Sequence, residues 1–191
     1  MAAPCSLWMA LVLLGALGVL PAPARASEQP GFQLDQFLGR WFSVGLASNT
    51  KWFREKKHLM SMCLVVVAPA APEHGQGVLS LTTGFLRKDK YETLSVLLTP
   101  TDTPGHYTYP SPFGGNTQDV WVEETHSEYA LLYSAWGAGE SSFHLATLYS
   151  RTETPQDAVK DKFTAFTAAK GFPKEDIDFL PNTGKCMEGH Q

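Results

Sequence analysis

The stretch Phe37-Leu38-Gly39-Arg40-Trp41-Phe42 opens the first convincing strand of this 191-residue chain. Gly39 has no Cβ atom, so the backbone can turn tightly there at little conformational cost. Trp41 follows that turn directly and brings a large, rigid, apolar ring into the strand. Such a triplet alone fits any turn glycine followed by a core tryptophan, so its meaning depends on the segments that accompany it.

The residues that follow this stretch alternate with a period of two. Such alternation over residues 40–47 predicts a strand. Because successive side chains of a strand point to opposite faces, the pattern divides the residues into two sets. One face would carry Trp41, Ser43, Gly45 and Ala47, and the other Phe42, Val44 and Leu46.

Seven more strands are expected behind the first. Residues 60–68 are apolar on both faces and rich in β-branched side chains, which predicts a fully buried strand. The other six strand candidates are separated by turn-like segments and cover residues 78–87, 91–99, 106–109, 117–124, 129–136 and 143–149. Short strands spaced about 8–12 residues apart predict an all-β sandwich or barrel.

The period changes from that of a strand to that of a helix after residue 153. Thr154 suits the N-cap position and Pro155 the first position of a helix. A stripe of apolar residues at helical spacing follows, made of Val159, Phe163, Phe166 and Ala169. Eight antiparallel strands followed by one late helix predict a closed up-and-down barrel with an internal ligand cavity and the helix outside.

Three shorter segments complete this predicted domain. Residues 32–37 fit one helical turn at the barrel base, and residues 177–180 fit one last short strand. Residues 49–58 break the strand pattern and predict either a long loop or a short helix. The aromatic pair Trp52 and Phe53 would either cover the mouth of a cavity or pack down onto the barrel.

The beginning of the chain has the features of a secretory leader. Residues 7–20 are almost wholly apolar, and Ala24-Arg25-Ala26 follows them as a small-residue cleavage pattern. The apolar run is shorter than the roughly 20 residues that span a bilayer. We therefore expect a signal peptide over residues 1–26 and one secreted domain over residues 27–191.

Composition excludes several classes of function. A formal net charge of −4 and 18% charged residues argue against a nucleic-acid partner. Hydrolase signatures and phosphate-binding glycine loops are absent from the sequence. The six histidines show no metal-pair spacing, so no metal is expected. The 43% hydrophobic and 12% aromatic content suits a fold with an apolar interior.

The chain contains three cysteines, of which Cys5 leaves with the leader. Secreted domains usually pair their cysteines, so Cys63 and Cys186 form either one bridge or none. The expected barrel separates the two residues in space, and we therefore predict two free thiols. A cysteine such as Cys63 in an apolar strand is usually a small core residue, and its alternative role is that of a nucleophile.

Several blocks of the sequence resemble the lipocalin family, and in particular its enzymatic branch, whose members isomerise prostaglandin H to prostaglandin D. Gly39, Trp41 and the late Arg151 resemble the family's structural motif, in which an arginine lies across the tryptophan at the closed barrel end. The resemblance covers nearly the whole chain and includes Ser61-Met62-Cys63, Phe85-Leu86-Arg87-Lys88 and residues 129–134, 146–152 and 162–166. It implies an eight-stranded antiparallel up-and-down barrel with one C-terminal α-helix packed outside.

The resemblance also implies a catalytic site inside the barrel. Cys63 would be the nucleophile that attacks the endoperoxide bridge of prostaglandin H, assisted by glutathione or another free thiol. This chemistry needs a thiolate, because the thiol is a poor nucleophile. Ser43 and Thr83 match hydroxyl residues that support the thiolate. The residues expected to contact ligand are Trp52, Phe85, Tyr107 and Tyr149.

A second hypothesis belongs to another class of function. In it the barrel only carries small lipophilic molecules such as retinoids, bile pigments or thyroid hormone, and Cys63 is a wall residue. The resemblance implies both activities in one cavity. It further implies a mostly monomeric protein secreted through the endoplasmic reticulum and Golgi, with relatives also found at the nuclear envelope. Peripheral membrane contact during secretion is compatible with it.

Two positions depart from the family pattern. Val65 stands where the family has a serine or threonine beside the nucleophile, and a hydrogen bond to a charged group contributes roughly 1.5–3 kcal/mol. Tyr91 stands where the family has the cysteine that pairs with the C-terminal one. Both departures lead us to expect a less acidic Cys63 thiol and an unpaired Cys186.

Overall fold

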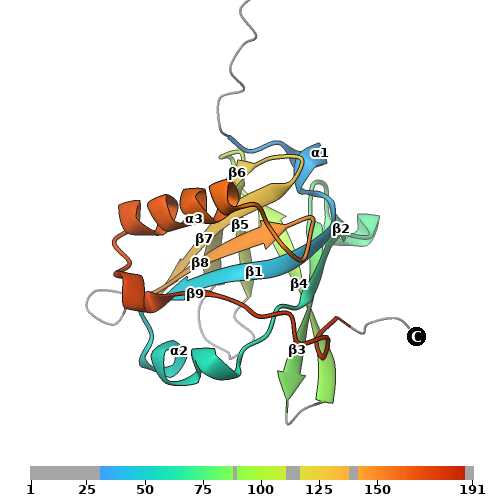
Figure 1. The fold of residues 1–191 in the computed structure, drawn as a ribbon. Coiled ribbons are helices and arrows are strands. Elements are labelled where there is room, and N and C mark those ends of the chain that lie inside the picture. Colours follow the sequence, from blue (N-terminus) through green and yellow to red (C-terminus); the bar gives the residue numbers. More distant parts are fainter. Residues whose placement is uncertain (1–30, 88–89, 111–116, 138–141, 188–191) are drawn as a thin grey trace, which may run out of the picture.

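The computed structural model describes residues 31–87, 90–110, 117–137 and 142–187 (Figure 1). The leader predicted at residues 1–26 lies outside this part of the chain. Within it, eight strands close into an antiparallel barrel, as predicted from the sequence. They are β1 (Gly39–Ser48), β2 (Leu64–Pro69), β3 (Leu79–Arg87), β4 (Lys90–Pro100), β5 (His106–Pro110), β6 (Thr117–Thr125), β7 (Tyr129–Trp136) and β8 (Phe143–Ser150).

The barrel closes because β1 has neighbours on both of its edges. Each strand from β2 to β7 pairs with the next along the chain, and β1 then pairs with β8 on one side and β2 on the other. The pairing with β2 covers only Gly39 to Phe42 of β1. The ninth strand, β9 (Ile177–Phe179), takes over the same edge and pairs with β1 from Gly45 to Ala47.

The opening stretch of the sequence forms the closed end of the barrel. The short helix α1 (Leu34–Phe37) precedes β1, and the Trp41 side chain is fully buried. The guanidinium carbon of Arg151 lies 3.4 Å from the centroid of the Trp41 ring, which is the expected cation–π contact. Arg151 also donates hydrogen bonds to the carbonyls of Gln36 and Leu38, both at 2.8 Å.

Gly39 makes this arrangement fit. Its φ is +105°, which an L side chain rarely adopts, and a Cβ atom there would lie 3.1 Å from Arg151 Nη1. The Trp41 indole donates a hydrogen bond of 2.8 Å to the Phe37 carbonyl. The turn, the tryptophan and the arginine therefore hold one another in place and close this end of the barrel. The cavity lies toward the opposite end.

The helix α3 (Asp157–Ala169) packs against the outside of the barrel, across β1 and its neighbours (Figure 1). Its anchor is Phe163, which is fully buried in a cluster that also contains Val44 and Leu148. The helix begins two residues later than predicted, with Gln156 rather than Thr154 at the N-cap. Gln156 has extended backbone angles, so the chain becomes helical only after it.

A β-bulge in β1 overturns the predicted division of its faces. The register against β8 shifts between Ser43 and Gly45. A Cβ atom on Gly45 would lie 2.9 Å from the Phe163 ring, so Gly45 faces the outer helix rather than the interior. Leu46 lines the cavity instead. Strict alternation cannot reveal an inserted residue, and it therefore assigned the wrong faces to both.

Short helical segments lie at the ends of the barrel. The chain between β1 and β2 forms α2 (Lys51–Lys56) and the 3₁₀ turn η1 (Lys57–Leu59), so the short helix, not the long loop, is present. Two further 3₁₀ turns are η2 (Pro72–His74) and η4 (Lys174–Asp176), the second of which leads into β9. None of the helices in the described ranges is long and apolar enough to cross a membrane.

Candidate functional site

A cavity of about 580 Å³ opens at the end of the barrel where α2 lies. Its wall is mostly apolar, with a few hydroxyl groups and one cationic side chain, Lys56. Most of the predicted site residues meet here. Those that line the cavity are Ser43, Trp52, Cys63, Thr83, Phe85 and Tyr149.

Cys63 lies immediately before β2, at the edge of the cavity. The strand predicted over residues 60–68 begins only at Leu64, so the cysteine belongs to the segment that leads into it. Its side chain is 8% exposed. The Ser43 hydroxyl lies 3.1 Å from the Cys63 backbone nitrogen and 3.2 Å from its carbonyl oxygen. Ser43 therefore fixes the cysteine backbone, and the hydrogen bond expected between Ser43 and the sulfur is not formed.

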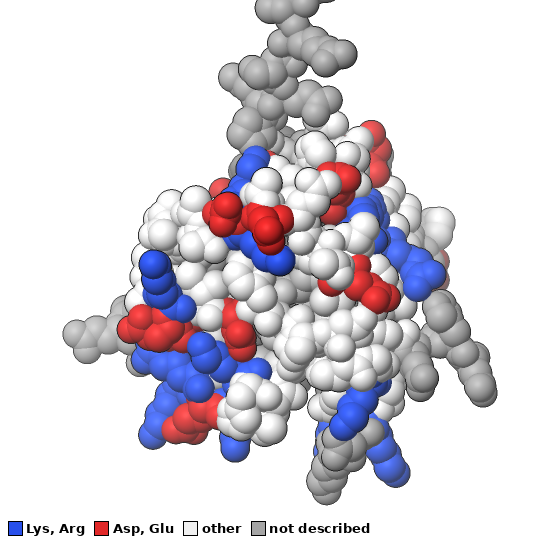
Figure 2. Space-filling view, in the orientation of Figure 1, with Lys and Arg blue, Asp and Glu red and all other residues white. Residues whose placement is uncertain are grey.

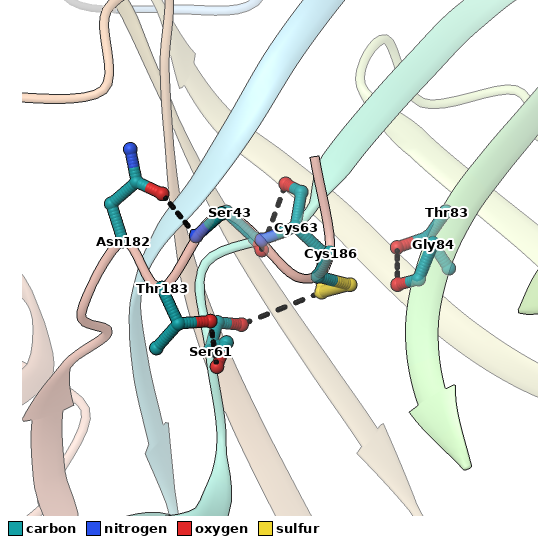
Figure 3. Close-up of a disulfide and its surroundings, with 9 residues drawn as sticks. Ser43, Ser61, Cys63, Thr83, Gly84, Asn182, Thr183 and Cys186 are labelled. Atoms are coloured by element: carbon teal, nitrogen blue, oxygen red, sulfur yellow. Dashed lines mark hydrogen bonds between the residues drawn. A yellow bond between two sulfur atoms is a disulfide. The ribbon is translucent and has the colours of Figure 1, made fainter. Parts of the chain in front are cut away.

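Cys63 is covalently bonded to Cys186, with a Cα–Cα distance of 4.7 Å (Figure 3). The prediction of two free thiols is therefore wrong. After β9 the chain runs back along the segment before β2: Met62 N–H donates to the Pro181 carbonyl at 3.0 Å, and Leu64 N–H donates to the Cys186 carbonyl at 3.3 Å. These few hydrogen bonds bring the two sulfurs together, and no pattern in the sequence predicts such long-range hydrogen bonds.

Tyr91 does not leave a gap where the family's second cysteine would stand. It lies on β4 opposite Leu86 of β3. Its ring covers Gly84, where an added Cβ atom would lie only 2.5 Å from the ring. The tyrosine thus fills the space above a glycine, and Cys186 pairs elsewhere.

Thr83 and Val65 lie opposite each other on the adjacent strands β3 and β2. Val65 pairs with Trp41 on one side and with Thr83 on the other, and it is 1% exposed. The Thr83 hydroxyl donates to the Gly84 carbonyl at 3.2 Å rather than to a sulfur. Cys63 Sγ lies 3.4 Å from the Ser61 carbonyl oxygen, which would accept a hydrogen bond from the reduced thiol.

The two predicted tyrosines occupy different depths of the barrel. Tyr149 lines the cavity, and its ring stacks with Trp41 at a centroid distance of 6.5 Å. Burial raises the pKa of the Tyr149 hydroxyl, and nearby Tyr109 raises it further. Tyr107 is 4% exposed and packs edge-on against Phe32 in the interior core. It is not among the cavity-lining residues described, so ligand contact by Tyr107 is not seen.

The two aromatic residues of α2, Trp52 and Phe53, have different environments. Trp52 is 62% exposed at the cavity mouth, whereas Phe53 is 2% exposed and packs inward. The Thr50 side chain caps the helix by accepting a hydrogen bond from the Phe53 N–H at 3.2 Å. Trp52 is thereby presented at the entrance, and only this member of the pair covers it.

The helix α2 is tied down by a buried carboxylate that the sequence analysis did not single out. Arg54 donates to both oxygens of Asp176, at 2.5 and 2.6 Å, and Asp176 is fully buried. The Lys57 ammonium donates to the Glu175 carbonyl at 2.7 Å. The mouth helix is thus fastened to the same C-terminal segment that carries Cys186. Only the tertiary fold reveals this link, because the partners are 122 residues apart.

Basic side chains gather at the mouth end of the molecule. Figure 2 shows Lys and Arg residues around α2, with Asp and Glu residues among them. Lys51, Lys56 and Lys57 come from α2 and η1. Lys51 lies 3.7 Å from Glu55, whereas Lys56 lines the cavity and is therefore the cationic side chain placed to attract an anionic ligand.

Solved structures share this architecture. The siderocalin Ex-FABP superposes with a TM-score of 0.67 at 22% identity, over 80% of this chain and 98% of that one. Lipocalin 12 from rat epididymis superposes with a TM-score of 0.67 at 26% identity, over 79% of this chain and 86% of that one. The first likeness shows the fold alone.

Relatives are more similar in sequence. Proteins named prostaglandin-H2 D-isomerase are 57% identical in the cat (Felis catus), covering 100% of both chains, and 56% identical in the dog (Canis lupus familiaris), covering 98% of both. The mouse (Mus musculus) protein of that name is 52% identical, over 98% of this chain and 100% of its own. A model of the lipocalin / cytosolic fatty-acid binding protein family matches residues 38–184. The chain therefore belongs to the lipocalin / cytosolic fatty-acid binding protein family.

Proposed function

We propose that this protein isomerises prostaglandin H to prostaglandin D inside its barrel, with Cys63 as the nucleophile once its disulfide is reduced. The observation that carries the proposal is the position of Cys63 on the wall of a cavity in a chain 57% identical, end to end, to a prostaglandin-H2 D-isomerase. The cavity of about 580 Å³ lies within the usual range of small-molecule sites, roughly 300–1,000 Å³.

The chemistry asks little beyond a thiolate and a shaped, apolar wall. The Cys63 thiolate attacks one oxygen of the endoperoxide, the O–O bond breaks, and the other oxygen takes up a proton. A base then removes the hydrogen from the carbon that bears the sulfur-linked oxygen. The C–H electrons form the ketone, and the S–O bond breaks to return the thiolate. Substrate atoms are rearranged with no net oxidation.

An external thiol has two roles in this scheme. Two thiols such as glutathione reduce the Cys63–Cys186 bond, because thiolates attack disulfide sulfurs through a mixed disulfide. A thiolate in solution also supplies a base of suitable strength for the C–H proton. The cavity wall supplies orientation: Trp52, Phe85 and Tyr149 offer aromatic surface to the lipid chains. Lys56 offers a positive charge to an anionic end.

We also propose the biological setting that the relatives and the leader support. The chain is secreted after removal of residues 1–26 and acts as a monomer on small lipophilic ligands. Release of the mature protein from cells, and its amino-terminal residue, would test this. A mature protein that retains residues 1–26 contradicts it.

The experiment that tests the activity uses the secreted protein with prostaglandin H and glutathione, beside a Cys63→Ala variant. Prostaglandin D should form well above the thiol-only background with the unchanged protein, and the variant should fall to that background. Equal product from both proteins would sink the proposal. Folding of the variant is checked by binding of a retinoid, which should quench tryptophan fluorescence in both.

A second candidate function is the transport of lipophilic molecules without chemistry. It is favoured by the disulfide, which occupies the sulfur of Cys63, and by Val65, which removes a hydroxyl from the wall. Under this hypothesis the oxidised protein binds retinoids as tightly as the reduced protein does, and prostaglandin H is released unchanged. Analysis of the product after incubation of the reduced protein with prostaglandin H and glutathione distinguishes the two hypotheses, because retinoid binding is expected under both.

A further inference from the structure

We infer that Cys186 is a resolving cysteine, and that the Cys63–Cys186 pair gives the barrel a second activity: reduction of the peroxide bond of a bound lipid to two hydroxyl groups. The inference rests on the proposed role of Cys63 as the nucleophile that attacks the endoperoxide. It adds a diol as a second product, oxidation of the protein to the disulfide in each turnover, and Cys186 as a second reacting residue.

The first step is the position of the second sulfur. Cys186 is fully buried, and its own backbone is held by the hydrogen bond from Leu64 N–H at 3.3 Å. Pro181 and Thr183, on the same C-terminal segment, bond to Met62 and Ser61 at 3.0 Å each. These contacts do not involve the sulfurs. Reduction of the disulfide therefore leaves Cys186 beside Cys63, at a high effective concentration.

The second step is the chemistry that this proximity permits. Attack by Cys63 on the endoperoxide produces a bond between Sγ and one substrate oxygen, while the other oxygen becomes a hydroxyl. The Cys186 thiolate then attacks Cys63 Sγ, the S–O bond breaks, and the released oxygen takes a proton. The peroxide has gained two electrons and become a diol, and two thiols have become one disulfide.

The cycle closes with an external monothiol. Two equivalents of glutathione reduce the Cys63–Cys186 bond back to two thiols and themselves become one disulfide. The covalent bond in the structure is then the oxidised form that ends each turnover. Atoms and electrons balance with one peroxide reduced for each pair of glutathione molecules oxidised.

The third step is the competition between the two fates of the S–O adduct. Isomerisation needs a base for the C–H proton, and the described residues that line the cavity include no histidine, aspartate or glutamate. Tyr149 lines it, but its raised pKa leaves the hydroxyl protonated near neutral pH. Resolution by Cys186 needs no such base from the wall. Without solution thiol, the diol should therefore be the main product.

The experiment is a single turnover. The protein is reduced, freed of small thiols, and mixed with an equimolar amount of prostaglandin H. The unchanged protein should yield the diol and lose two free thiols per diol formed. Cys186→Ser should yield diol only at the background set by a Cys63→Ser/Cys186→Ser protein, and it should form prostaglandin D once glutathione is added to supply the base. Cys186→Ala repeats the comparison with a second side chain, and retinoid binding checks the folding of each variant.

The outcomes separate this inference from the proposed isomerase. Prostaglandin D from the unchanged protein, with all thiols retained and no diol, overturns the resolving role and leaves the isomerase standing. Diol with matching thiol loss in the absence of glutathione, and no prostaglandin D from the unchanged protein or Cys186→Ser when glutathione is present, supports the resolving role and overturns the isomerase. No product above background, either without or with glutathione, overturns both. If the Cys186 variants do not fold, the ratio of thiols lost to diol formed in the unchanged protein still decides.

Discussion

Val65 places an apolar side chain in the cavity wall where a hydroxyl group would support the proposed Cys63 thiolate. It lies between Trp41 and Thr83 in the sheet and lines the cavity with 1% of its surface exposed. It lies two positions after Cys63, and no described hydroxyl is hydrogen-bonded to that sulfur. A thiolate formed there lacks hydroxyl hydrogen bonds that would stabilise its charge.

Val65→Ser should raise the rate of prostaglandin D formation by the reduced protein several-fold, because a hydroxyl that donates to the thiolate stabilises it by about 1.5–3 kcal/mol. Rates measured across pH should show the acidic limb moving to lower pH. Val67→Ser is the matched control: Val67 has the same 1% exposure in β2 but does not line the cavity. An equal rate gain in both variants, or none in either, contradicts the interpretation.

Tyr149 makes a prediction about alkaline pH. Burial, and to a lesser extent Tyr109, raises the pKa of its hydroxyl above the value of about 10 in an unfolded chain. The folded state therefore holds its proton more strongly than the unfolded state does. The associated stability is complete below about pH 10 and is lost as pH rises toward the folded pKa.

Tyr149→Phe should reduce the loss of stability between about pH 9 and pH 11. Urea unfolding at both pH values measures the difference. The loss should shrink without vanishing, because burial also raises the pKa of Tyr107 and Tyr109. An unchanged pH dependence in the variant would show that Tyr149 titrates normally in the folded protein.

At the scale of elements, the contact between β1 and α3 depends on the bulge. Gly45 leaves room for the Phe163 ring, and a Cβ atom would lie 2.9 Å from that ring and 3.2 Å from Leu148 Cβ. Phe163 is fully buried beneath the helix. The glycine thus sets how closely the helix approaches the barrel. The side chains that face it, Phe163 and Leu148, both belong to the packed core.

Gly45→Ala should destabilise the protein by about 1–3 kcal/mol, because the helix must shift to admit a methyl group into a close-packed contact. The midpoint of urea unfolding measures this. Phe163→Leu serves as the companion change: in its presence, Gly45→Ala should be less harmful, since the smaller side chain leaves space. If the effects of the two substitutions on the free energy of unfolding are additive, the contact with the Phe163 ring is not the cause of the destabilisation by Gly45→Ala.

The elements were predictable from the sequence where periodicity was strong. Alternation and turn residues located eight strands, and the apolar stripe through Phe163 located the outer helix. Periodicity failed where a single residue is inserted, as between Ser43 and Gly45, or where the helix begins without a side-chain cap, as at Gln156. Those features depend on tertiary packing rather than on local pattern.

At the scale of the whole molecule, the candidate site was predicted in its composition but not in its covalent state. Cys63, Thr83 and Tyr149 line one cavity as expected, while Tyr107 packs deeper in the barrel. The disulfide was missed because the path of the chain after β9 follows from a few long-range hydrogen bonds. Strand periodicity carries no information about such contacts.

The Cys63–Cys186 bond closes a loop between residues 123 positions apart. Reducing it should lower the free energy of unfolding by about 2–5 kcal/mol, mainly by enlarging the unfolded ensemble. Urea unfolding with and without a reducing thiol measures this. Cys186→Ser should show the same loss without thiol, and adding thiol should change it no further. Identical midpoints for oxidised and reduced protein would contradict a closed loop.

The order of the elements along the chain also determines when the barrel and the disulfide can form during synthesis. Cys63 is made 123 residues before Cys186, and at about 5–20 residues per second that interval is roughly 6–25 s. The barrel cannot close until β8 has emerged, and the cysteine bond cannot form until almost the last residue has been added. Until Cys186 has been added, the thiol of Cys63 has no disulfide partner, so the nascent chain carries a free thiol at the residue on which its proposed activity depends.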